Sequence, residues 1–411
     1  MSESLTRTDE NRERAPVAAA GFDGLRTWLA HRLCVDALGL DIVLPGGACL
    51  PRRGGVALAT VRIRDRTTLL HLAWDPETAF ATAYTSGRLE VEGELEPLLE
   101  RISVASRDWP ERWWQGWTLF DGSRDRVRES IHQHYDLGNE FYRLWLDRDL
   151  VYTCAYFEQP DMSLEAAQTA KLDLVCRKLN LQPGETVVEA GCGWGALALH
   201  MAKHYGVHVR AFNISHEQIK YARARAEREG VAHVDFFEQD YRDIDGTCDA
   251  FVSVGMLEHV GVAHFAALGD VIGRVLRPDG RGLLHFIGRN QPRPLSKWIR
   301  DNVFPGAYPP TLDEVSVGVL RPANLSVLDV ENLRLHYALT LAHWLQRYEQ
   351  HRNEVARQHG DAFVRMWRMY LAGSQAAFAT GGMQLFQILF ARGETNQVPW
   401  TRDWLRTPIA R

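Results

Sequence analysis

Short apolar runs alternate with segments of helical periodicity over the second half of the chain. The runs of strand length are 186–189, 208–212, 233–237, 250–254 and 281–287, and the helical segments are 195–205, 215–229 and 263–276. Alternation of strands and helices with short connections predicts a parallel sheet covered by helices on both faces. A ligand of such a sheet binds outside the carboxyl ends of the strands, so we expect the chemistry in the loops that follow them.

The pattern at 19–103 predicts a small, separate α+β domain. Its expected elements are a helix at 21–40, strands at 56–64, 67–72 and 87–91, and a helix at 75–84. The last helix has Asp75 as its N-cap and Pro76 in its first turn, a common arrangement at helix starts. This region carries no catalytic signature, so the remaining domain, 131–411, is expected to hold the active site.

Two further segments lack a regular pattern. Residues 1–18 are charged and featureless, and we expect a disordered tail there. The segment 104–130 reads as a linker, but it contains four tryptophans spaced as on one face of a short helix. They are Trp109, Trp113, Trp114 and Trp117. Such a face suits the polar edge of a bilayer, and it equally suits a plug between domains.

Composition narrows the class of protein. The 411 residues predict two or three domains, and 45% hydrophobic and 24% charged residues are typical of globular proteins. The net charge of −5 argues against a nucleic-acid partner. The six cysteines form no CxxC pair, which argues against a disulfide framework or a zinc site. With no apolar run of about 18 residues and a polar start, the chain is expected to be cytoplasmic.

The strongest chemical signal is VVEAGCGWG at 187–195, between a predicted strand and a predicted helix. Glycines at 191, 193 and 195 let a ligand approach the backbone closely, and their GxGxG spacing differs from the GxGxxG of dinucleotide sites. Glu189 just before the loop suits an ammonium group better than a phosphate. This combination predicts a site for S-adenosylmethionine, whose amino-acid end is zwitterionic.

Polar side chains at the ends of the next two strands extend this predicted site. Asn213 and Gln218 follow the second strand, where a ribose is commonly held, and Tyr241 follows the third, where adenine is expected. The alternative interpretation is that these polar residues only cap helices. Capping alone accounts for Ser215 better than for the whole set of polar residues.

Several further blocks resemble the cyclopropane-fatty-acyl-phospholipid synthase family, relatives of the mycolic acid cyclopropane synthases. The blocks are HYDLGNEFY (134–142), VYTCAYF (151–157), EAAQTAKLDL (165–174), SVGMLEHVG (253–261), LLHFIG (283–288) and FPGAYPP (304–310). The resemblance implies a Rossmann-like class I methyltransferase domain preceded by a lipid-binding domain. It also implies transfer of a methyl group from S-adenosylmethionine to a cis double bond of a phospholipid acyl chain, then proton loss and ring closure.

The resemblance assigns residues to two sites. The positions implied to hold a bicarbonate ion, the expected base, are Cys154, Glu258, His285, Ile287 and Tyr337. The positions implied for the cofactor are Tyr152, Thr153, Gly191, Gly193, Asn213, Ile214, Gln218 and Tyr241. Three positions of the predicted cofactor site differ from the residue that is common in the family: threonine replaces serine at Thr153, glutamate replaces aspartate at Glu189, and asparagine replaces threonine at Asn213. We expect these differences to alter the affinity for the cofactor rather than to abolish activity. No activating base is evident for Cys154, so we do not expect a covalent nucleophile.

The expected carbocation needs a dry slot lined by aromatic faces. Candidate rings, some of which would be plain core, are Tyr135, Tyr152, Tyr156, Phe157 and Tyr337. A basic loop at 289–300 either binds anionic headgroups of lipids or is simply solvated. Its basic residues, around Trp298, are Arg289, Arg293, Lys297 and Arg300. The expected partners are the inner face of the cytoplasmic membrane, an unsaturated acyl chain and, from the resemblance, a second copy of the chain.

Two alternatives stay open from the sequence. An enzyme with the same cofactor and lipid could stop before ring closure and leave a methyl- or methylene-branched chain. A lipid-binding protein could retain the methyltransferase fold without activity. The complete set of bicarbonate positions favours the cyclopropane product.

Overall fold

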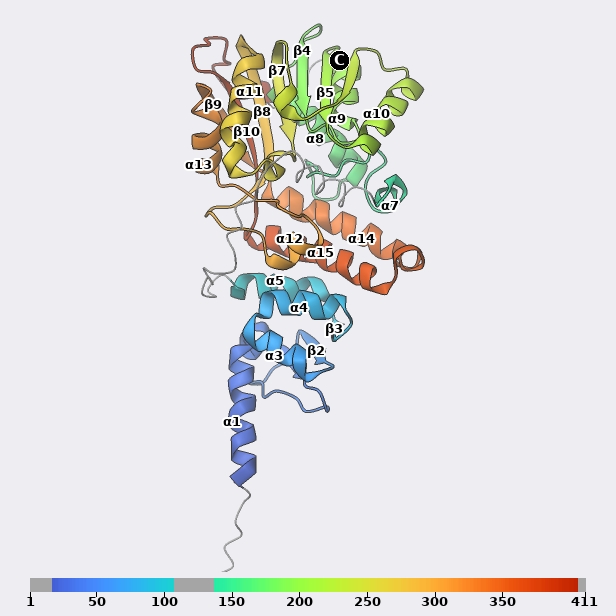
Figure 1. The fold of residues 1–411 in the computed structure, drawn as a ribbon, viewed down its shortest axis with the longest axis vertical. Coiled ribbons are helices and arrows are strands. Elements are labelled where there is room, and N and C mark those ends of the chain that lie inside the picture. The colour runs from blue at the N-terminus through green and yellow to red at the C-terminus, as the bar shows by residue number, and fades with distance from the viewer. Residues whose placement is uncertain (1–16, 107–136, 406–411) are drawn as a thin grey trace, which may run out of the picture.

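The computed structural model describes residues 17–106 and 137–405 (Figure 1). The predicted N-terminal tail falls outside these residues up to position 16, and positions 17 and 18 belong to a helix. The four linker tryptophans and Tyr135 also fall outside the described residues. No helix within the described residues is long and apolar enough to cross a membrane.

A seven-stranded sheet forms the centre of the larger domain. Its order is β6-β5-β4-β7-β8-β10-β9, in which every neighbouring pair is parallel except those of β10, which runs antiparallel to β8 and β9. The strands are β4 Thr186–Ala190, β5 His208–Asn213, β6 Val234–Glu238, β7 Cys248–Val254, β8 Leu276–Gly288, β9 Leu325–Asn332 and β10 Gln384–Arg392. The predicted parallel sheet is confirmed, and the strand order reverses at β4, next to the glycine-rich loop.

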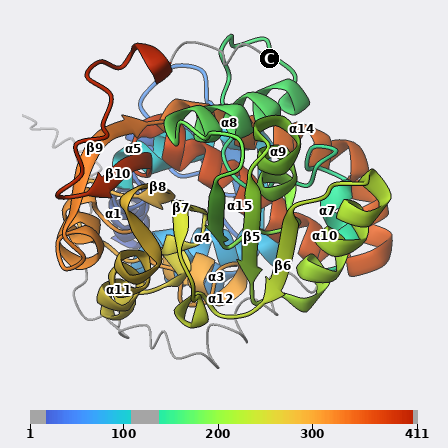
Figure 2. The ribbon, with the colours of Figure 1, turned by 90° about the horizontal axis from the view of Figure 1, so that it is seen from above.

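Helices cover both faces of the sheet, as the alternating pattern predicts (Figure 2). One face packs against α8 (Leu164–Lys178), α9 (Ala196–Tyr205) and α10 (His216–Glu229). The opposite face packs against α11 (Phe265–Val275), α13 (Leu312–Val315) and the short helix η5 (Ser316–Leu320). The strands therefore bury apolar residues on both sides, which is why they appear in the sequence as nearly continuous apolar runs.

The N-terminal domain holds a three-stranded sheet in the order β1-β2-β3. Its elements are α1 Val17–Arg32, α2 Val35–Leu38, β1 Leu40–Val43, β2 Ala59–Ile63, α3 Arg66–Trp74, α4 Pro76–Thr85, β3 Leu89–Gly93 and α5 Leu95–Ala105. The strand predicted at 67–72 is wrong, because this segment is helical. Asp65 caps α3 by accepting from the backbone N–H of Thr68 at 2.7 Å, a start signal that outweighs the β propensity of the two threonines.

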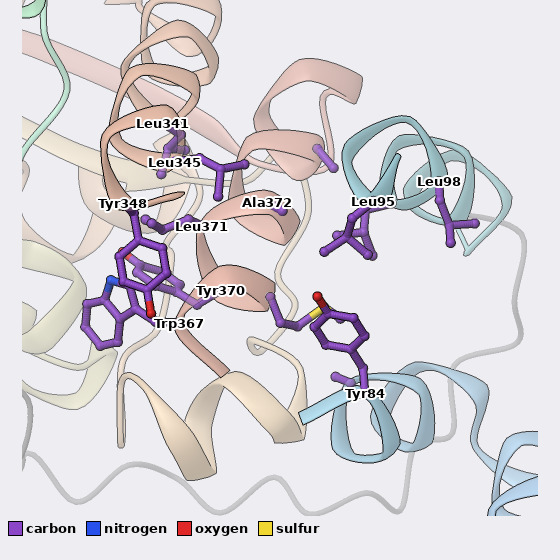
Figure 3. Packing of buried hydrophobic residues seen from close by; sticks show 14 of the residues in the cluster. Tyr84, Leu95, Leu98, Leu341, Leu345, Tyr348, Trp367, Tyr370, Leu371 and Ala372 are labelled. Carbon is purple, nitrogen blue, oxygen red and sulfur yellow. The ribbon is translucent and has the colours of Figure 1, made fainter. Parts of the chain in front are cut away.

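A helical hairpin joins the two domains. Helices α14 (Arg334–His359) and α15 (Asp361–Thr380) connect β9 to β10, and α15 packs against α4 and α5 (Figures 1 and 3). Arg368 of α15 donates to the hydroxyl of Tyr84 at 2.8 Å, and the hydroxyls of Ser103 and Thr380 are 2.8 Å apart. The short helix α12 (Lys297–Asn302) lies at this junction and contacts α4, whereas α7 (Asn139–Arg143) packs near the turn between α14 and α15 (Figure 1).

Candidate active site

A cavity of about 340 Å³ runs from the core of the N-terminal domain to the sheet of the larger domain. Most of its walls are apolar. In the N-terminal domain the lining includes Leu33, Leu38, Leu40, Ile42, Val61, Ile63, Leu72, Phe80, Ala81, Leu89 and Leu99. Helices α14 and α15 supply the middle section through Leu341, Met369, Ala377 and Phe378. The cavity is within the size range of ligand pockets, and its shape suits an apolar chain.

Polar side chains gather at the sheet end of this cavity. All five residues predicted for the bicarbonate site line it, together with Tyr152 and Thr153. Four parts of the chain position them. They are the loop that holds Cys154, the short helix η3 (Leu257–His259) after β7, the end of β8 with His285 and Ile287, and Tyr337 on α14. The structure thus brings together residues that are up to 183 positions apart in the sequence.

Glu258 is held by one carboxylate oxygen. Its Oε1 accepts from the backbone N–H of Ile287 at 2.5 Å, whereas Oε2 is buried and has no hydrogen-bond partner among the described residues. Burial raises the pKa of Glu258 to about 7, and the Ile287 hydrogen bond opposes this effect. The carboxyl group can therefore gain or lose a proton near neutral pH.

His285 is fixed in the same way, through one ring nitrogen. Its Nδ1 lies 3.0 Å from Nε2 of Gln387, while its Nε2 is buried without a partner in the part of the chain that the structure describes. Burial, with smaller contributions from Lys171 and Lys178, holds the pKa of His285 well below its usual value. The imidazole is thus neutral, with one nitrogen left for a ligand.

Cys154 is completely buried beside this pair, and burial raises the pKa of its thiol far above the usual value. The thiol donates to the carbonyl of Ala155 at 3.1 Å. A neutral, hydrogen-bonded thiol is a poor nucleophile, which agrees with the expectation that Cys154 forms no covalent intermediate.

The candidate aromatic rings fall into two groups. Tyr152 and Tyr337 line the cavity. Tyr156 stacks on His336 and Phe157 stacks on His343, and neither ring is part of the lining. Only the first pair is placed to face a cation in the cavity.

A second, smaller cavity of about 60 Å³ lies beyond the carboxyl ends of β4, β5 and β6. Gly191, Asn213, Ile214 and Tyr241 line it, as the cofactor prediction requires, and His259 lines both cavities. Gly191 has φ of 86°, and a Cβ added there would lie 3.0 Å from the Cβ of Met256. The loop therefore needs glycine, and its backbone remains open to a ligand.

Three other residues predicted for the cofactor, Gly193, Gln218 and Glu189, line neither cavity. Asn213 donates to Oε1 of Gln218 at 2.7 Å and to the carbonyl of Gly193 at 3.4 Å. Glu189 is only 2% exposed and lines neither cavity. Burial raises its pKa to about 8, with Lys171 opposing, and its Oε2 has no partner among the described residues. Glu189 thus lies under the glycine loop and outside the lining of the cavity, so its contact with the ammonium group of a ligand stays a prediction. The glycine loop and the polar lining suit S-adenosylmethionine.

The basic loop differs from the prediction. Trp298 is buried against the larger cavity and not presented to solvent, because 297–302 forms α12. Lys297 pairs with Asp301, one turn further along that helix, and Arg293 lies 4.0 Å from Glu77. The loop is thus partly neutralised by acids that the sequence segment itself does not contain.

Sequence reasoning missed several residues of the site. Lys171 is buried in α8 and donates to Oγ1 of Thr153 at 2.9 Å, and the hydroxyls of Tyr152 and Tyr370 lie 2.8 Å apart. Gln387, beside His285, is fully buried. A polar residue inside an apolar strand, as in QLFQILF at 384–390, is the signal that could have identified Gln387.

Comparison with known proteins agrees with this geometry. Residues 122–388 match the family described as mycolic acid cyclopropane synthetase. A probable fatty acid methyltransferase of Pseudomonas putida is 38% identical over 84% of this chain and 90% of its own. The cyclopropane-fatty-acyl-phospholipid synthase of Escherichia coli K12 is 38% identical over 64% of this chain and 68% of its own.

A solved structure extends the likeness to three dimensions. The mycolic acid cyclopropane synthase CmaA1, complexed with SAH and CTAB, is 30% identical with a TM-score of 0.61, over 64% of this chain and 97% of its own. The fold, the glycine loop and these matches agree. The chain is therefore a member of the mycolic acid cyclopropane synthetase family and an S-adenosylmethionine-dependent methyltransferase.

Proposed function

We propose that this enzyme converts a cis double bond of a phospholipid acyl chain into a cyclopropane ring. The observation that carries the proposal is that one cavity extends from an apolar part to Cys154, Glu258 and His285. We call its apolar part, lined by the N-terminal residues named above, the apolar chamber. An acyl chain can occupy the apolar length while its double bond lies beside the polar groups. The name of the Escherichia coli relative, a cyclopropane-fatty-acyl-phospholipid synthase, supports the same substrate class.

The residues of the site have separate tasks in this reaction. S-adenosylmethionine supplies a methyl group on a sulfonium, which an alkene carbon attacks. An alkene is a weak nucleophile, so alignment and exclusion of water supply much of the catalysis, and the apolar walls provide both. The methyl transfer leaves a carbocation on the acyl chain, and the faces of Tyr152 and Tyr337 stabilise it.

Ring closure then requires loss of one proton from the transferred methyl carbon as the new carbon–carbon bond forms. We propose that bicarbonate, held by this chain, supplies the base. The donor set fits a small oxyanion, because Nε2 of His285 and Oε2 of Glu258 are both buried with no partner among the described residues. With Glu258 partly protonated near pH 7, both groups can donate hydrogen bonds to an anion.

We also propose that the enzyme works on a membrane surface. Leu25 and Trp28 of α1 and Leu70 and Trp74 of α3 are all more than half exposed. Leu33, which directly follows α1, and Leu72 of α3 line the cavity, which supports entry of lipid from this surface. Arg289 lines the cavity too and can meet a headgroup phosphate. A homodimer is compatible with this arrangement and is tested by sedimentation.

A branched product is the second candidate. The Pseudomonas putida relative is named a probable fatty acid methyltransferase, and another, from Mycobacterium tuberculosis, is named a tuberculostearic acid methyltransferase. This enzyme would share the cofactor and the lipid and would not close a ring. Loss of a proton from a neighbouring chain carbon would leave a methyl-branched alkene, whereas a hydride shift along the chain followed by loss of a proton from the transferred methyl carbon would leave a methylene branch.

Purified enzyme incubated with S-adenosylmethionine and vesicles of unsaturated phospholipid separates these candidates. The proposal expects acyl chains that are heavier by one CH₂, with cyclopropane protons and no alkene protons by NMR. The same mass gain with an alkene retained would support the methylene-branched product instead. Unchanged lipid and no release of S-adenosylhomocysteine would contradict both and favour a lipid-binding protein.

A further inference from the structure

A row of hydrogen-bonded side chains leads from the edge of the sheet to His285. Strands β8, β10 and β9 are neighbours, and Gln387 on β10 is the direct cross-strand partner of both His285 on β8 and Glu331 on β9. Lys178, the last residue of α8, completes the row. Gln387 and Lys178 are at most 2% exposed, so their hydrogen bonds are shielded from water.

The hydrogen bonds of this row have only one consistent direction. Nζ of Lys178 donates to a carboxylate oxygen of Glu331 and, at 2.7 Å, to Oε1 of Gln387. An ammonium group has donors only, so it fixes the oxygen of the Gln387 amide on its own side. The amide nitrogen of Gln387 then faces Nδ1 of His285 at 3.0 Å and must donate to it.

This direction determines which nitrogen of His285 carries its proton. A neutral imidazole has one N–H and one lone pair, and Nδ1 must use its lone pair to accept from Gln387. The proton therefore lies on Nε2, the buried atom with no partner among the described residues. His285 consequently offers an N–H donor at the cavity rather than an acceptor.

We propose that Gln387, oriented by Lys178, is a positioning residue that holds His285 in the Nε2–H tautomer so that the ring can donate to an anion in the cavity. The inference rests on the proposed function only for the identity of that anion. The tautomer itself is a property of the chain alone. The ion pair of Lys178 with Glu331 supplies the donor that orients the amide. Burial of Lys178 lowers its pKa, and the charge of Glu331 opposes that change.

The test begins with the ligand-free enzyme. Histidine labelled with ¹⁵N gives a pyrrole-like or a pyridine-like signal for each ring nitrogen, and loss of signals in His285→Gln assigns those of His285. We expect a pyrrole-like Nε2 and a pyridine-like Nδ1. A pyrrole-like Nδ1 in the wild-type enzyme would overturn the proposal, whatever the activity.

Two variants at position 387 separate positioning from packing. In Gln387→Glu a carboxylate accepts from Nδ1–H, so we expect the pyridine-like Nδ1 signal to disappear and turnover to fall at least about tenfold. The KM for S-adenosylmethionine should change less than about threefold, because the smaller cavity does not include this residue. In Gln387→Met the Nδ1 partner is lost, and we expect a mixture of tautomers with an intermediate rate.

The matched control is Gln384→Met, which removes another buried amide from the same strand. Gln384 bonds to Asn332 and Gly381, away from His285. It should leave the His285 signals and the KM unchanged. If Gln387→Met and Gln384→Met slowed turnover equally and the His285 tautomer did not change in either variant, Gln387 would have only a structural role. A correct tautomer in an enzyme that makes no cyclopropane would instead overturn only the proposed function.

Discussion

The two ends of the larger cavity differ in chemistry although one wall, α15, runs along both. The sheet end presents a carboxyl group, an imidazole, a thiol and the phenol of Tyr152, and each of them is hydrogen-bonded to a neighbouring group. The other end, in the N-terminal domain, presents mostly leucine, isoleucine and valine side chains. The difference agrees with the proposed function, in which the polar end carries the chemistry and the apolar end holds an acyl chain.

The largest expected effect comes from removing the acid at the sheet end. Glu258→Gln keeps the size of the side chain but cannot exchange a proton, so we expect turnover to fall by about 10²- to 10⁴-fold. Binding of S-adenosylmethionine, measured by calorimetry, should be unchanged. Cys154→Ser should slow turnover less, because the thiol is not a nucleophile. If Glu258→Gln turned over at the wild-type rate, Glu258 would have no part in the mechanism.

Glu258→Gln also tests the raised pKa of Glu258, through the pH dependence of the free energy of unfolding. With its pKa raised to about 7 in the folded state, Glu258 keeps its proton where the unfolded chain has lost it. Wild-type stability relative to Glu258→Gln should therefore fall as pH rises from about 4.5 to 7, and then level off. Since each unit of pKa corresponds to about 1.4 kcal/mol, the fall approaches about 3 kcal/mol. Urea unfolding at pH 5 and pH 8 measures it, and an equal difference at both values would contradict the assigned pKa.

At the apolar end, filling the cavity should affect lipid and spare the cofactor. Ala81→Phe places a ring in the space lined by α4, so we expect kcat/KM for phospholipid to fall about tenfold or more. The KM for S-adenosylmethionine should not change. Thr82→Phe adds the same ring to the exposed face of the same helix and serves as the control. Equal losses in the two variants would show that the chamber does not hold substrate.

The smallest effect is expected beside the smaller cavity. Asn213→Ala removes one hydrogen bond to Gln218 and one to the carbonyl of Gly193, each contributing about 1 kcal/mol. The affinity for S-adenosylmethionine should weaken about three- to tenfold, with the maximal rate on lipid nearly unchanged. Calorimetry and initial rates separate the two quantities, and a large loss of rate at saturating cofactor would assign Asn213 a different role.

The comparison also explains what the sequence could predict. The parallel sheet was predictable, because its strands are buried on both faces and the helices between them keep a clear period. The apolar chamber was not, because Leu40, Val61 and Leu99 look the same in a sequence whether they face a solid core or a cavity. The β propensity of Thr67 and Thr68 misled the prediction for α3, because the helix start at Asp65 outweighs it.

The site residues divide in a similar way. Glu258 and His285 were found because they lie in blocks that resemble a known family, yet nothing local indicated which of their atoms would be free. That depends on contacts over long sequence separations, such as the 102 residues between His285 and Gln387. The sequence left open whether the loop around Trp298 binds headgroups or is solvated, and the fold buries Trp298 against the cavity.

Photocrosslinking with phospholipid tests most directly whether one acyl chain spans both domains. Two lipids would carry a diazirine on the acyl chain, one on each side of the cis double bond, and labelled peptides would be mapped by mass spectrometry. We expect one of the two probes to label peptides from 33–102, at residues that line the cavity, and we expect Ala81→Phe to suppress this labelling. Labelling confined to 137–405 with both probes would contradict it.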